Sequence, residues 1–252
     1  MEILHYFEYL LPLLFFVVAF MYSSIGLGGG SSYTALMVIS GMSALAIPIV
    51  SLSLNLLVST LSSYHFLRNK HGKLYIVLPF LISAIPFAYL GGALHLPETL
   101  FLWVLLVSLI IVVMRIYFWQ DISFKLDLNH RQKVIVSLIL GSILGLIAGI
   151  VGIGGGVYLV PIIIMLKIGS VKEAAAAGAI FVWTVSFFGL ISRLQHNSVN
   201  LMDYIPLIVA VIIGGFLGAY MGSTKFSSNT IEKILGVIIL MSIVFLLKKL
   251  LF

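Results

Sequence analysis

The residues best suited to chemistry in this sequence are two glycine clusters, SIGLGGG at residues 24–30 and IVGIGGG at residues 150–156. Each cluster directly precedes a short apolar stretch that we expect to be helical. The first N–H groups of a helix have no partner within the helix, and together with the helix dipole they favour an anion. Consecutive glycines let a ligand approach that backbone closely. The pattern predicts an anion site made by the amides of Gly28, Gly29, Gly30, Gly154, Gly155 and Gly156.

A few polar side chains accompany the glycines. Ser31 and Ser32 follow the first cluster and Tyr158 follows the second, so their hydroxyls could add donors. Asn55 is an amide about midway along an apolar segment, where bonding between helices and contact with a substrate are both open. Thr184 stands in a comparable segment of the second half, although an isolated Thr usually bonds to a carbonyl of its own helix.

The elements that position these residues are membrane helices. Of the 252 residues, 62% are hydrophobic and only 9% are charged, whereas about a quarter of the residues of a soluble domain are charged. Most of the apolar segments are long enough to cross a bilayer, which takes about 20 residues per helix. We therefore expect an all-α, multi-pass protein of the cell membrane. The segments fall at about 9–27, 31–40, 44–67, 74–94 and 99–119, and again at 134–151, 157–166, 172–194, 204–222 and 232–250.

The two runs of five segments form an internal repeat. The glycine clusters align at an offset of 126 residues, and Pro79 and Gly91 align with Pro206 and Gly218 at an offset of 127. In each run the second segment has only ten residues, about half of what a bilayer requires. We expect one membrane domain with repeat one at 9–119, a linker at 120–133 and repeat two at 134–250.

The relative direction of the two repeats depends on their first two segments. If these form a hairpin, the repeats are inverted, and 11 Lys and Arg residues lie on one side against three on the other. If they form one broken span, the repeats are parallel and the division is 10 to 4. The positive-inside rule barely separates the two. We favour the hairpin, because a first segment about 28 Å long leaves no depth for ten further residues. Loops 68–73 and 120–133 would then be cytoplasmic.

The glycine tract in both halves, Pro161 five residues after Gly156 and the duplicated layout resemble the TauE/SafE family, also called the 4-toluene sulfonate uptake permease family. The resemblance spans both halves. It implies a membrane transporter for sulfite, sulfonates or related organosulfur anions, by export or uptake. In the first copy Ala35 stands where Pro161 stands in the second, and Ser31-Ser32 replaces an apolar pair. The two half-sites are therefore unequal, and the size of the substrate does not carry over.

These features together predict a secondary or facilitative transporter of a small sulfur-containing oxyanion that works by alternating access. No ATPase motif, metal-ligand cluster or hydrolase elbow stands in the sequence, so we expect no enzyme activity, cofactor, bound metal or nucleic acid. The expected partners are the anion and the lipid bilayer, with a coupling ion (H⁺ or Na⁺) and a homodimer left open. The alternative is a membrane scaffold or assembly protein whose glycine clusters serve helix packing only.

Ionisable residues are placed near the ends of the apolar segments. Arg115 and Arg193 lie where long side chains usually extend to the membrane interface, so a buried arginine clamp for the substrate is not expected. His65 lies near the loop end of its segment, where an interfacial position and a role in proton coupling are both open.

Overall fold

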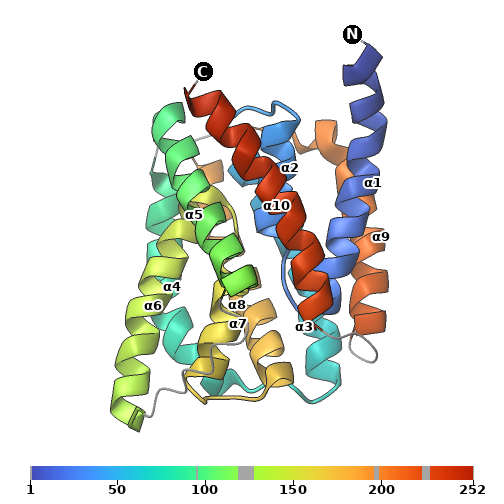
Figure 1. Ribbon diagram of the computed structural model, residues 1–252. Helices are drawn as coiled ribbons and strands as arrows, with labels where there is room; N and C mark the ends of the chain where they lie inside the picture. The colour runs from blue at the N-terminus through green and yellow to red at the C-terminus, as the bar shows by residue number, and fades with distance from the viewer. Residues whose placement is uncertain (1, 95, 119–127, 196–198, 223–227, 252) are drawn as a thin grey trace.

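The computed structural model describes residues 2–94, 96–118, 128–195, 199–222 and 228–251, and over these residues every regular element is a helix (Figure 1). The all-α prediction is confirmed. The first half contains α1 (Glu2–Ser24), α2 (Gly30–Ile39), α3 (Ala46–Arg68), α4 (Leu74–Ala93) and α5 (Glu98–Phe118). The second half contains α6 (His130–Val151), α7 (Gly156–Met165), α8 (Val171–Leu194), the short 3₁₀ helix η1 (Leu201–Tyr204), α9 (Ile205–Gly222) and α10 (Ser228–Leu251).

Six helical stretches among the described residues are long and apolar enough to cross a membrane, as judged by length and composition. The helices α2 and α7 have 10 residues each, which at about 1.5 Å per residue reach only half of the hydrocarbon core. The two half-length segments expected from the sequence are therefore present. The six stretches are Ala46–Arg68, Leu74–Ala93, Glu98–Phe118, His130–Val151, Val171–Leu194 and Leu201–Met221.

Side-chain caps determine where two of the helices begin. The side chain of Ser170 accepts a hydrogen bond from the Glu173 amide at the start of α8, in a reciprocal capping box. Asn129 and Gln132 form a second capping box at the start of α6. Because of this cap, α6 begins at His130 and takes in the last residues of the predicted linker 120–133. Residues 119–127 of that linker lie outside the described residues.

In each half the first helix and the half-length helix form a hairpin. Both chain termini lie at one end of the molecule, and α1 runs away from that end while α2 returns toward it (Figure 1). The helices α6 and α7 form a hairpin that runs in the opposite direction (Figure 1). The N-terminal ends of α2 and α7 consequently face the middle of the molecule.

The long helices pack across the two halves rather than within them. The helix α1 packs along α9, α6 packs along α4, and α3 and α8 pack against each other. Glycines in the first two interfaces lie directly against backbone carbonyls of the partner helix, so these helices approach closely. They are Gly214 and Gly218 of α9 in one interface and Gly141, Gly145 and Gly149 of α6 in the other.

Candidate functional site

The two glycine loops, residues 25–29 and 152–155, meet in the interior between the two halves. A methyl group added at Gly30 would overlap the backbone carbonyl of Ile153 in the other loop. One added at Gly154 would lie 3.0 Å from both Asn55 Nδ2 and Val182 Cγ1. All residues of both loops are buried. The structure thus brings together the two clusters that the sequence places 126 residues apart.

The half-length helices α2 and α7 begin in the same way. Their N-cap residues, Gly29 and Gly155, have left-handed φ angles of 85° and 74°, which glycine adopts without steric cost. The first hydrogen bonds to these caps come from the amides of Ser32 and Tyr158, at 3.1 Å in both helices. The amides that precede Ser32 and Tyr158 have no acceptor within their own helix, so they can donate to a ligand. They belong to Gly30 and Ser31 in α2 and to Gly156 and Val157 in α7.

Asn55 of α3 is fully buried and contacts both loops. Its Nδ2 donates a hydrogen bond to the carbonyl of Gly152 at 3.0 Å. The Ser51 hydroxyl donates to the same carbonyl at 2.7 Å. Asn55 Oδ1 faces the first loop, where a methyl group added at Gly28 would lie 2.8 Å away. Among the described residues Oδ1 has no hydrogen-bond partner. Bonding between the halves therefore accounts for the amide nitrogen but not for the oxygen.

Val182 of α8 borders the glycine loops as well. It stands 127 residues after Asn55 and is thus its counterpart in the repeat. A methyl group added at Gly28 or Gly156 would meet a Val182 methyl group first, at 2.5 and 2.6 Å, and one added at Gly154 would lie 3.0 Å from Val182 Cγ1. A polar residue, Asn55, and an aliphatic residue, Val182, therefore lie against the same glycines. A comparison of positions at the 127-residue offset could have identified Val182 from the sequence.

The Tyr33 hydroxyl is a donor that the sequence analysis missed. Tyr33 is fully buried and stacks on Phe15 with ring centroids 5.2 Å apart. A methyl group added at Gly29 would lie 2.9 Å from the hydroxyl oxygen, so the hydroxyl group lies over the first glycine loop. It has no hydrogen-bond partner among the described residues. The four-residue spacing from Gly29 to Tyr33 was the available signal, because residues four apart share a helix face.

The hydroxyls that the sequence analysis did propose make hydrogen bonds within the protein. Ser31 Oγ lies 2.7 Å and Ser32 Oγ 3.1 Å from the hydroxyl oxygen of Tyr22. The Tyr158 hydroxyl donates to the Ser108 carbonyl of α5 at 2.7 Å. Thr184 Oγ1 donates to the Ile180 carbonyl one turn earlier, at 2.9 Å. These contacts leave the loop amides, and the Tyr33 hydroxyl over Gly29, as the donors available to a ligand.

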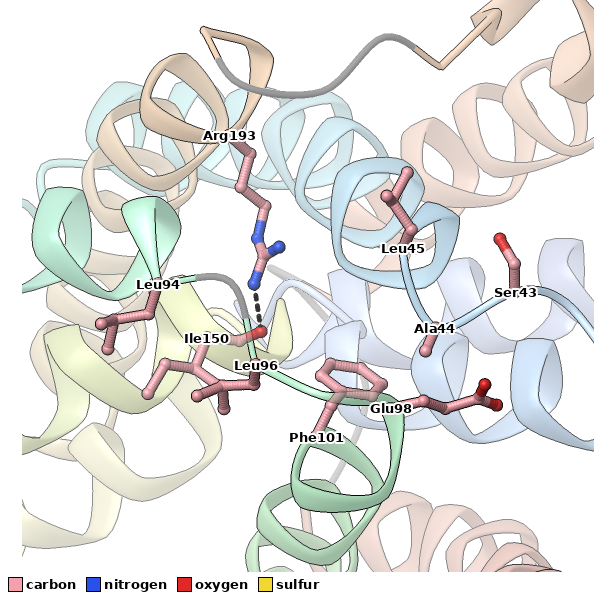
Figure 2. A pocket seen from close by; sticks show the side chains of 9 residues that line it. All are labelled: Ser43, Ala44, Leu45, Leu94, Leu96, Glu98, Phe101, Ile150 and Arg193. Atoms are coloured by element: carbon pink, nitrogen blue, oxygen red, sulfur yellow. Dashed lines mark hydrogen bonds between the residues drawn. The ribbon is translucent and has the colours of Figure 1, made fainter.

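A pocket of about 300 Å³ lies on one side of the second glycine loop (Figure 2). It lies between the start of α3, the connection from α4 to α5, and the C-terminal ends of α6 and α8. Its floor contains Ile150, two residues before the loop begins. The lining residues are Ser43, Ala44, Leu45, Leu94, Leu96, Glu98, Phe101, Ile150 and Arg193.

Arg193 is a buried member of this pocket, with only 7% of its surface exposed. Its Nε donates to the Gly149 carbonyl at 3.1 Å, and Nη2 donates to the Ile150 carbonyl (Figure 2). These carbonyls belong to the last turn of α6, where a positive charge also complements the helix dipole. The expectation that Arg193 extends to the membrane interface is wrong. The end of α6 lies within reach of α8, and the guanidinium turns toward its carbonyls.

The opposite side of the glycine loops is closed by apolar side chains. Phe66, Ala175 and Ala176 form a small buried cluster there. A methyl group added at Gly26 would lie 3.1 Å from the Phe66 ring and 3.0 Å from Ala175 Cβ. Beyond this cluster, Lys73 Nζ and Glu173 Oε1 form an ion pair at 2.5 Å that joins the starts of α4 and α8.

Comparison with known proteins relates the chain to one family of membrane transporters. Residues 11–246 match the family described as sulfite exporter TauE/SafE. The chain is 34% identical over 237 residues to the probable membrane transporter protein y4hK of Sinorhizobium fredii, which covers 92% of this chain and 95% of that protein. It is 26% identical over 113 residues to the probable membrane transporter protein YunE of Bacillus subtilis, covering 45% and 41% of the two chains. No solved structure matches.

Proposed function

This chain belongs to the sulfite exporter TauE/SafE family and is a membrane transporter, and from that premise we propose the substrate and the mechanism. The substrate is a small sulfur-containing oxyanion, sulfite or an organosulfonate. The protein moves it across the cell membrane by alternating access, as a secondary or facilitative transporter. The end that carries Arg68, Lys73 and Lys172 faces the cytoplasm, in keeping with the positive-inside rule.

The observation that carries the proposal is the meeting of the two half-helix N-termini. The amides at the starts of α2 and α7 converge on one buried region that Asn55, Val182 and Tyr33 border. Backbone that leaves the helix at membrane depth is tolerated where protein or a cavity covers it, and paired breaks of this kind mark substrate sites in transporters. Neutral dipoles suit a small anion, because they supply several donors without a fixed positive charge.

The packing of long helices across the two halves supports the alternating-access part of the proposal. The first helix of each half packs along the fourth helix of the other half: α1 packs along α9, and α6 packs along α4. The hairpins α1–α2 and α6–α7 run in opposite directions (Figure 1), which supports inverted repeats. A pocket lies on one side of the glycine loops and an apolar cluster on the other. Rocking of α1 and α9 against α4 and α6 would exchange the open and closed sides.

Uptake of labelled sulfite into proteoliposomes tests this function. Saturable uptake that sulfonates inhibit, and that chloride and a neutral amino acid do not, is the expected result. Variation of pH and of Na⁺ would then identify the coupling ion. Protein that is folded and inserted but transports none of these anions would contradict the proposal. It would favour the alternative function as a scaffold or assembly protein, in which the tight contacts of the glycines serve helix packing alone.

A further inference from the structure

Asn55 provides an acceptor where an anion site calls for donors. Its nitrogen faces the Gly152 carbonyl, which can only accept, so the orientation of the amide is fixed by that bond. Oδ1 must then face Gly28 and the centre of the site. The side chain is fully buried, and Oδ1 lacks a hydrogen-bond partner among the described residues. A buried acceptor without a partner is unfavourable, so a bound ligand that supplies a donor would be favoured.

The Arg193 guanidinium, on the pocket side of the second loop, is bound to the Gly149 and Ile150 carbonyls. The groups in contact with the glycines of the site carry no formal charge. They are the loop amides, the Tyr33 hydroxyl, the Asn55 amide and the Val182 methyl groups. Transfer of a dianion from water into such surroundings costs far more than transfer of a monoanion, because the solvation energy of an ion grows steeply with its charge. The loop amides can bind the anionic oxygens, and Oδ1 can accept from a protonated atom of the same ligand.

Building on the proposed function, we propose that the site selects monoanions that also carry a hydrogen-bond donor, and that Asn55 Oδ1 accepts from that donor. For sulfite the bound form is hydrogen sulfite, whose added proton faces Asn55. The sulfite and sulfate dianions lack this donor and carry twice the charge. Asn55 is therefore a specificity-determining residue, and its counterpart Val182, which lies against the same glycines, makes no polar contact of this kind.

Two ligands of matched size and charge test the proposal on the unmodified protein. Methanesulfonate and sulfamate are both monoanions with an –SO₃⁻ group, but sulfamate carries an –NH₂ donor where methanesulfonate carries a methyl group. Competition against labelled sulfite in purified, detergent-solubilised protein gives the affinity of each. We expect sulfamate to bind about tenfold tighter or more, because methanesulfonate leaves Oδ1 without a partner.

Variants at the two counterpart positions localise the effect. Asn55→Val gives both counterpart positions the same side chain, and the ratio of the two affinities should fall to about one. The Gly152 carbonyl retains the Ser51 hydroxyl as a donor in this variant, which favours a folded protein. Val182→Ala is the matched control. Whatever it does to the two affinities, their ratio should stay as in the unmodified protein.

The outcomes separate this inference from the proposed function. If neither sulfite nor the two probes bind to the folded protein, the proposed function itself fails. If sulfamate and methanesulfonate bind equally well, the anion site stands and the donor requirement is wrong. Equal binding that depends on Na⁺ would also overturn the inference, because Oδ1 would then serve a cation.

Discussion

The two glycine loops share one backbone plan, but the side chains around them differ in kind. Where the first half has the polar Asn55, the second has Val182, and where the first has the apolar Phe66, the second has Arg193, in both cases 127 residues later. Each pair thus contains one polar residue. The shared plan presents the amides of two helices to one place, whereas the differences decide which ligand fits and which side is open. Duplication therefore accounts for the geometry of the site but not for its selectivity.

The polar members of both pairs act on the second loop. Asn55 bonds to the Gly152 carbonyl, and Arg193 bonds to the carbonyls of Gly149 and Ile150. The first loop has Phe66 and Ala175 against it instead. We infer that side-chain hydrogen bonds hold the second loop, while apolar packing holds the first.

The largest effect is expected from Gly30→Ala in the first loop. The added methyl group would overlap the Ile153 carbonyl, and backbone there cannot move without separating the loops. We expect at least about a hundredfold loss of anion affinity, measured by competition with labelled sulfite, since a displaced loop breaks several hydrogen bonds to the ligand at once. Gly41→Ala is the control for an added methyl group, because a methyl group at Gly41 would have nothing within 4 Å, although Gly41, unlike Gly30, has a positive φ, of 76°.

The matching change in the second loop, Gly156→Ala, should be milder. Its methyl group would lie 2.6 Å from Cγ2 of Val182, a side chain rather than backbone. Adding Val182→Ala provides room and should restore most of the affinity lost by Gly156→Ala. If Val182→Ala does not restore the affinity, the two loops respond alike to an added methyl group, and the proposed difference between them is wrong.

Arg193→Leu tests how the second loop is held. It removes the donors to two buried carbonyls at the end of α6, and we expect the free energy of unfolding to fall by about 1–3 kcal/mol. Thermal unfolding in detergent would show this as a lower midpoint. Phe66→Leu at the counterpart position removes only part of an apolar contact and should destabilise less. If Phe66→Leu lowers the unfolding midpoint more than Arg193→Leu does, the inference that side-chain hydrogen bonds hold the second loop is wrong.

Two tyrosines, one in each half-length helix, should show opposite consequences of losing a hydroxyl. Tyr33→Phe should weaken anion binding about tenfold without loss of stability, because this hydroxyl has no partner among the described residues. Tyr158→Phe should instead lower the free energy of unfolding by about 1 kcal/mol, because its hydroxyl donates to the Ser108 carbonyl. Affinity and unfolding measured on both variants would separate the two roles.

The smallest effect is expected from the ion pair at the closed side. Glu173 raises the pKa of Lys73 above its usual 10.5, so the pair stabilises the fold throughout neutral pH. The part of that contribution that depends on Lys73 should be lost as the pH rises from 10.5 through the raised pKa of Lys73. The Lys73 side chain is 45% exposed, and exposed pairs contribute little. Lys73→Gln should therefore barely change the midpoint of thermal unfolding at neutral pH. A large change in that midpoint would show that the ion pair contributes more to stability than its exposure suggests.

The sequence was sufficient to predict the helices and the repeated glycine loops, because length, hydropathy and glycine spacing are local properties. The conformations of single side chains were less accessible. The orientation of Ser31 and Ser32 toward Tyr22 depends on how α1 packs on α2. The burial of Arg193 depends on where the end of α6 lies relative to α8, which no spacing in the chain expresses.

The cross-packing of the halves has a consequence for how the protein is made. The helix α1 packs mainly along α9, so during synthesis the first membrane helix emerges long before its partner and must wait in the bilayer for most of translation. Contacts between such distant parts of a chain form late. A truncated first half would leave α1 without that partner, whereas two halves produced as separate chains in one cell retain every contact and should assemble. The protein thus assembles by the packing of its two halves against each other, although both halves belong to one chain.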